Sequence, residues 1–165
     1  MKITLICLLV VYSLIGCSAS SVVTKRESFL RQPITATQLF LVVNYGGGDE
    51  KSKKLVDDMK ANLVGRLMAS GIAKGMADAA SCERRIEINL DQVECVSGLQ
   101  RVLWGVMAGR NKLGGQVALI DCKTGQALLR FYAQGESASH PFSGEAGSDS
   151  AVTSFTQSIV DEIKK

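Results

Sequence analysis

Three cysteines, Cys82, Cys95 and Cys122, are the residues best suited to chemistry in the body of this 165-residue chain. In an oxidising compartment two of them can form a disulfide while the third is left over, and the sequence permits all three pairings as well as no bridge at all. Cys95 and Cys122 lie in strand-like segments that could be neighbours, and Cys82 precedes the first of these segments. No Cys-x-x-Cys spacing links them to each other or to His140, so we expect neither a metal site nor a bound cofactor.

The other polar groups favour structural roles. Gly46–Gly48 lies between a predicted strand and a predicted helix, but it lacks the Gly-Lys-Ser/Thr ending of a phosphate-binding loop, and Asp49 and Glu50 would repel a phosphate. The adjacent Asp57 and Asp58 point to different parts of a helix surface, and no catalytic motif accompanies His140. We therefore expect no catalytic residues and a protein that is not an enzyme. The net charge of +3 is too small to indicate a nucleic-acid partner.

The amino-terminal residues have the layout of a secretory signal peptide. Lys2 is followed by an apolar run that ends in Leu14-Ile15-Gly16-Cys17, which resembles the bacterial lipoprotein box. That resemblance implies that residues 1–16 are removed, that Cys17 is lipidated with acyl chains such as palmitate, and that several chains anchor the protein stably in a membrane. Ser18 stands where an aspartate would resemble an inner-membrane retention signal, so we expect the outer membrane of a Gram-negative bacterium and a domain that faces the periplasm. The alternative is an incidental Cys17 and a soluble secreted protein.

Residues 17–36 are dominated by small and polar side chains with no periodicity. This composition predicts a flexible tether between the lipid and the domain, with a root-mean-square reach of about 25 Å. A periplasmic domain then spans residues 37–165.

Hydrophobic periodicity predicts the elements of that domain. Strands are expected over residues 37–44, 84–95 (with a bulge at Asp91-Gln92), 115–122 and 126–134, and residues 72–80 read as a short strand or a loop. An amphipathic helix is expected over residues 51–70, with Asp49 as its N-cap, and a second from residue 148 or 149 to the end. This order indicates an α/β (α+β) two-layer sandwich, with a mixed sheet of four to five strands and two helices packed on one face.

The stretch from Leu99 to Met107 contains Leu103 and Trp104, the sole tryptophan, and its spacing predicts a short apolar helix. It either closes the core or forms an exposed patch for a protein partner, for self-association or for the membrane surface.

From Arg84 onward the sequence resembles an uncharacterised bacterial lipoprotein family, the domain of unknown function forty-four-ten. The matching features are the alternating strand, the apolar stretch ending in Gly109-Arg110, and the Asp121-x-x-Thr124-Gly125 turn. The element order also resembles small α/β domains of the curli-secretion lipoprotein and of lipoprotein activators of peptidoglycan synthases. These likenesses imply a binding or assembly module with an envelope protein as partner. The alternative is a subunit of a homo-oligomeric outer-membrane or secretion-associated assembly.

Overall fold

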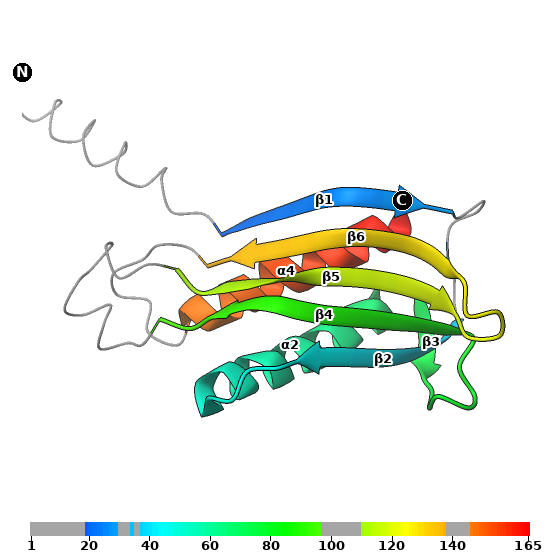
Figure 1. Cartoon of the computed structure of the whole chain (residues 1–165), viewed down its shortest axis with the longest axis horizontal. Coiled ribbons are helices and arrows are strands. Elements are labelled where there is room, and N and C mark those ends of the chain that lie inside the picture. Colours follow the sequence, from blue (N-terminus) through cyan, green and yellow to red (C-terminus); the bar gives the residue numbers. More distant parts are fainter. Residues whose placement is uncertain (1–18, 30–33, 35–36, 97–109, 138–145) are drawn as a thin grey trace, which may run out of the picture.

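The computed structural model describes residues 19–29, 34, 37–96, 110–137 and 146–165, with side chains of the last range from residue 150 onward. Its elements are β1 (Ser20–Ser28), β2 (Thr37–Tyr45), α2 (Glu50–Ala69), β3 (Ala73–Met76), β4 (Arg84–Glu94), β5 (Lys112–Asp121), β6 (Ala127–Glu136) and α4 (Ala146–Lys164). The strands form one mixed sheet in the order β1-β6-β5-β4-β2-β3, and both helices lie on the same side of it (Figure 1). The predicted class and the two helices on one face are confirmed. The described sheet has six strands, so the predicted four to five is an undercount.

Apolar stripes on the two helices build the core between the layers. Leu55, Met59, Leu63 and Leu67 of α2 are buried, as are Val152, Phe155, Ile159 and Ile163 of α4. They pack against Ile86, Ile88, Leu119 and Phe131 from the facing side of the sheet. The helical spacing of three or four residues that predicted these helices is therefore the spacing that fills the core.

Local sequence determines both ends of α2. The Asp49 carboxylate accepts a hydrogen bond from the Ser52 backbone N–H at 2.8 Å, which confirms the predicted N-cap. The helix ends at Ala69 with Ser70 as its C-cap, and Gly71 follows with φ +74°, a conformation that favours glycine.

Further sequence predictions can be compared with the structure. The bulge in β4 lies between Leu90 and Gln92, as the change of phase at Asp91 predicts. Of the two alternatives left open for residues 72–80, a short strand or a loop, the structure has a strand, β3. The strands predicted over residues 115–122 and 126–134 are β5 and β6, which pair antiparallel as a hairpin; β5 begins at Lys112 and β6 ends at Glu136, beyond the predicted limits. The last helix begins at Ala146, two residues before the earlier of the two predicted starts, residue 148.

The predicted flexible tether over residues 17–36 is wrong for Ser20–Ser28, because these residues form the edge strand β1, which pairs antiparallel with β6. Its side chains are almost all exposed, so the segment has no apolar signature. Pairing with β6, and an ion pair between Arg26 and the buried Glu162 of α4, hold it on the domain. Both contacts are distant in sequence, and composition alone therefore did not reveal the strand.

Candidate functional site

Cys82 and Cys122 form a disulfide, and their Cα atoms are 6.0 Å apart. Cys82 lies two residues before the start of β4 and Cys122 directly follows β5, and these strand ends are already joined by the pairing of Arg84 with Asp121. The Arg84 Nη1 and Asp121 Oδ2 atoms are 2.5 Å apart. Hydrogen bonds from the Thr124 backbone N–H and its neighbours, followed by the Arg84 charge, hold the pKa of Asp121 below its usual value. The sequence left the pairing open, and the structure selects the pair that the β4–β5 register brings together.

Cys95 remains a free thiol. It is half-buried, and the Ser52 hydroxyl donates a long hydrogen bond of 3.9 Å to its sulfur. Burial raises the pKa of the Cys95 thiol, so the nucleophilic thiolate is disfavoured. Over the described ranges no three His, Cys, Asp or Glu side chains are grouped so as to hold a metal ion.

The adjacent acids of α2 lie in separate ion pairs. Asp57 Oδ1 is 3.3 Å from Lys60 Nζ, and Asp58 Oδ2 is 3.4 Å from Lys54 Nζ. The two carboxylates thus have different partners on the helix surface, as expected, and do not form an acid–base pair.

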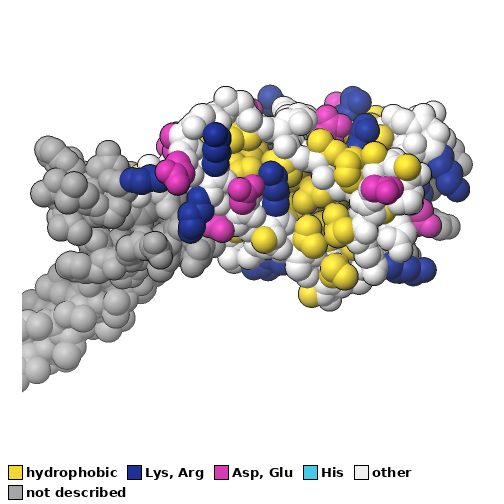
Figure 2. Space-filling model, turned by 90° about the horizontal axis from the view of Figure 1, so that it is seen from below, with side chains coloured by type: hydrophobic (Ala, Val, Ile, Leu, Met, Phe, Trp, Pro, Cys, Tyr) yellow, Lys and Arg dark blue, Asp and Glu magenta, His cyan; other side chains and the backbone are white. Residues whose placement is uncertain are grey.

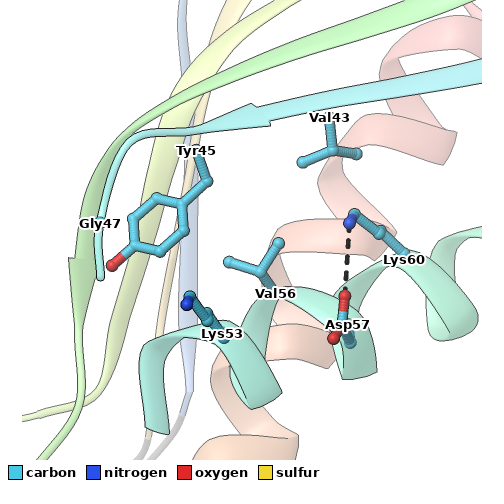
Figure 3. A pocket seen from close by; sticks show the side chains of 7 residues that line it. All are labelled: Val43, Tyr45, Gly47, Lys53, Val56, Asp57 and Lys60. Carbon is cyan, nitrogen blue, oxygen red and sulfur yellow. Dashed lines mark hydrogen bonds and ion pairs between the residues drawn. The ribbon is translucent and has the colours of Figure 1, made fainter. Parts of the chain in front are cut away.

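An open cavity of about 270 Å³ lies between the end of β2 and the first half of α2 (Figure 3). Its walls are both apolar and charged: Val43, Tyr45 and Gly47 come from the strand and its following loop, and Lys53, Val56, Asp57 and Lys60 come from the helix. We call this cavity the β2–α2 groove. Figure 2 views the molecule from this side and shows hydrophobic side chains gathered on the surface with basic and acidic side chains beside them.

The glycine loop shapes one end of the groove. A Cβ atom on Gly47 would lie 1.9 Å from the Tyr45 hydroxyl oxygen, so only glycine lets the tyrosine ring lie against the backbone as it does (Figure 3). Gly47 therefore has a packing role, whereas a Cβ atom on Gly46 or Gly48 would meet no atom within 4 Å.

The charged residues that line the groove are two lysines and one aspartate, so one positive charge is left over. Lys60 is paired with Asp57, whereas Lys53 has no ion-pair partner among the residues that the structure describes. The groove thus combines apolar walls with one uncompensated ammonium group.

Backbone hydrogen bonds of β2 show which of its groups face each neighbour. The Leu39 carbonyl accepts from the Ala77 N–H at 2.8 Å, on the β3 side, and the Gln38 carbonyl accepts from the Glu83 N–H at 3.0 Å, on the β4 side. Successive residues of a strand direct their backbone N–H and C=O groups to opposite sides. The backbone groups of the odd-numbered residues of β2 therefore point away from β4.

The outer side of β2 is consequently open along its second half. β3 pairs with β2 only as far as Leu39, opposite Met76. Beyond that point, in the part of the chain that the structure describes, no strand meets the outward N–H and C=O groups of Leu41, Val43 and Tyr45. The sequence predicted a buried strand here. Instead Phe40–Val43 are half-buried, because the helices cover only one face of the sheet and one flank of the strand has no neighbouring strand.

Several predicted site residues lie outside the described residues: Cys17, the apolar segment with Leu103, Trp104 and Met107, and His140. Their predicted roles stay predictions. None of the helices that the structure describes has the length and apolar character needed to cross a membrane.

The described residues form a two-layer α+β domain with an open strand edge beside the β2–α2 groove. The chain belongs to the family described as domain of unknown function DUF4410, whose model matches residues 46–141, so the predicted family is confirmed. No curated protein matches the sequence.

Solved structures with the same fold are distant in sequence. A variant of the PelC dodecamer from Paraburkholderia phytofirmans shares 15% identity over 87% of this chain and 97% of that chain, with a TM-score of 0.59. Another PelC dodecamer structure from that organism gives 14% identity over the same shares and a TM-score of 0.58. A DUF330 protein from Xanthomonas campestris shares 12% identity over 80% of this chain and 84% of that chain, with a TM-score of 0.50.

Proposed function

We propose that this chain is a lipid-anchored protein of the outer membrane, whose periplasmic domain is a non-enzymatic binding or assembly module for another envelope protein. The observation that carries the proposal is the Cys82–Cys122 disulfide, which joins residues 40 positions apart in the sequence. Structural disulfides persist in oxidising compartments such as the periplasm and are rare in the cytosol. The signal-peptide layout and Cys17 point to the same destination.

β1 begins only a few residues after Cys17, which limits how far the domain can lie from a lipid on that cysteine. Cys17 and Ser20 are three residues apart, and three extended residues span at most about 11 Å. A lipid on Cys17 would therefore hold the domain close to the membrane surface, and would not allow the reach of a long tether. Ser20 pairs with Glu136, so this end of the sheet would face the lipid.

The contacts of the cysteines and of the adjacent aspartates support a non-enzymatic role. Cys82 and Cys122 are joined to each other, Cys95 has a raised pKa, and Asp57 and Asp58 are paired with lysines. Each of these groups has a structural partner or an environment that lowers its reactivity.

The anchor is tested by metabolic labelling in cells with an alkyne analogue of palmitate. We expect label on the wild-type chain and none on Cys17→Ser, with Cys95→Ser as the matched control that keeps its label. Label that persists on Cys17→Ser would refute the anchor. Reactive-thiol trapping in the same cells should find the Cys82–Cys122 bridge intact, and a fully reduced chain would contradict a periplasmic location.

A second candidate function is that of a subunit in a homo-oligomeric envelope assembly. The likeness of the fold to the PelC dodecamer favours it, although an identity of 15% supports the fold and no more. Sedimentation of the full chain in detergent separates the two candidates. A concentration-independent monomer contradicts the assembly, and a discrete large species supports it.

A further inference from the structure

We infer that the open edge of β2, together with the β2–α2 groove, is the docking site for an extended, acidic peptide segment of a partner protein, which adds a strand beside Phe40–Tyr45. The inference rests on the proposed binding role and specifies its surface and the chemistry of the partner.

The first argument is the row of backbone groups that β2 leaves open. The outward N–H and C=O groups of Leu41, Val43 and Tyr45 meet no strand among the described residues. An exposed sheet edge of this kind can hydrogen-bond an added strand along its backbone. The three residues could offer a run of alternating donors and acceptors of the kind that strand addition uses.

The second argument is that this edge lacks the devices that protect edge strands from pairing. Phe40–Tyr45 contains no charged residue and no proline, and its register with β4 is regular. β1, at the opposite edge, does have such protection: its pairing shifts between Thr24 and Glu27, and Lys25 there has φ +52°. A bulge with charged residues twists an edge away from new partners.

The third argument is the groove beside the edge, which gives side-chain selectivity. Val43 and Val56 face one another across it, next to the ring of Tyr45 (Figure 3). An apolar side chain of the added strand fits between them. Lys53 stands at the same place without an ion-pair partner among the described residues, so a carboxylate on the added strand would compensate its charge.

The same features favour a peptide over a second copy of this chain as the strand that pairs with β2. Pairing of β2 with β1 of another copy would use the bulged edge that carries Lys25 and Arg26. Pairing of β2 with its own counterpart would bring the Lys53 groups of both copies to one interface. An acidic extended segment meets neither obstacle.

The test uses the full chain in detergent micelles and three labelled nine-residue peptides, with binding followed by fluorescence anisotropy. One peptide alternates valine and glutamate, the second alternates valine and lysine, and the third is the acidic peptide with N-methyl groups on alternate amides. We expect the acidic peptide to bind, and the lysine and N-methylated peptides to bind at least about tenfold more weakly, because they lose charge complementarity and strand hydrogen bonds respectively.

Two charge-reversal variants test the position of the site. Lys53→Glu should weaken binding of the acidic peptide about fivefold or more. Lys54→Glu is the matched control: it makes the same charge change one residue along the helix, where Lys54 lies outside the groove and pairs with Asp58. It should leave binding within about twofold. In NMR spectra the peptide should shift the amide signals of Leu41, Val43 and Tyr45.

The inference is overturned if no peptide binds, or if N-methylation or the sign of the peptide charge does not change the affinity. It is overturned as well if Lys53→Glu and Lys54→Glu bind the acidic peptide equally, or if the peptide shifts amide signals outside β2 and the groove. It is also overturned if the peptide-free chain dimerises and Val43→Pro, which removes an outward N–H, makes it monomeric, since β2 then pairs with a second copy. The proposed function fails separately: an unlipidated chain that binds peptide refutes the anchor alone, and a lipidated chain that binds none refutes the docking edge alone.

Discussion

Arg26 of β1 forms an ion pair with Glu162 of α4, a carboxylate whose side chain is only 2% exposed. The contact joins a strand near the amino terminus to the last helix, and Lys165 pairs with the same carboxylate at 2.7 Å. Burial of a carboxylate is costly unless it is compensated by a charge and by hydrogen bonds. Glu162 thus adds a side-chain contact to the backbone pairing with β6 that holds β1 on the domain.

Removal of the Arg26 charge should destabilise the protein measurably. Arg26→Met leaves Glu162 buried with Lys165 as its one charged partner among the described residues, and we expect a loss of about 1–3 kcal/mol in the free energy of unfolding. Urea denaturation of the full chain in detergent measures it. Arg85→Met is the control, because the pair of Arg85 with Glu87 is more exposed and should contribute less than about 1 kcal/mol. Equal losses in the two variants would show that burial of Glu162 has no energetic consequence.

Reduction of the disulfide should lower stability without changing the fold. Cys82→Ser opens a loop closed over a separation of 40 residues, and the chain-entropy account gives a loss of about 2–4 kcal/mol. The midpoint of urea denaturation measures it, and β-sheet circular dichroism should be unchanged. Cys95→Ser serves as control, since this thiol is free. A larger effect from Cys95→Ser than from Cys82→Ser would contradict the assigned pairing.

Acid should weaken the junction of β2 with β4 through Glu83. The Thr37 hydroxyl donates to Glu83 Oε2 at 2.6 Å and the Gln38 backbone N–H donates at 3.3 Å, and these bonds hold the pKa of Glu83 below its usual value. A carboxyl with a depressed pKa in the folded state stabilises the protein above its unfolded-state pKa, and this contribution is lost as the pH falls through the folded-state pKa.

Glu83→Gln and Thr37→Val should therefore both reduce the difference in stability between pH 7 and pH 3. Thr37→Val is informative because it keeps the carboxyl and removes only the hydroxyl donor. Urea midpoints at the two pH values provide the measurement. A variant pair whose acid sensitivity equals that of the wild type would exclude Glu83 as a contributor.

Gly135 should not tolerate a side chain. A Cβ atom at this position of β6 would lie 2.4 Å from the Phe155 backbone nitrogen and 2.7 Å from the Ala151 carbonyl oxygen. Gly135→Ala must then push α4 away from the sheet, and we expect a loss of at least about 2 kcal/mol, as for other overpacked cores. Thermal unfolding measures it. Gly65→Ala is the control, because a Cβ there meets no atom within 4 Å and alanine favours the helix, so this variant should be neutral or stabilising.

Periodic elements were predictable because their signals are local. The i, i+4 stripe from Leu55 to Leu67, the Asp49 cap and the change of phase at Asp91 each depend on residues that are close in sequence. The same locality made the family recognisable from the strand, turn and loop pattern after Arg84, and the match over residues 46–141 confirms it.

The tertiary structure alone decided which edges the sheet leaves open and which cysteines meet. β1 has no apolar pattern, and it is a strand because β6 and Glu162 lie beside it. The apolar run Phe40–Val43 predicts a buried strand whether one or two strands pair with it. Its open flank depends instead on where β3 ends, which the run itself does not indicate. Cys122 pairs with Cys82 and not with Cys95 because the antiparallel register of β4 and β5 sets Arg84 against Asp121. Register and strand order arise from contacts between distant segments, which local periodicity does not encode.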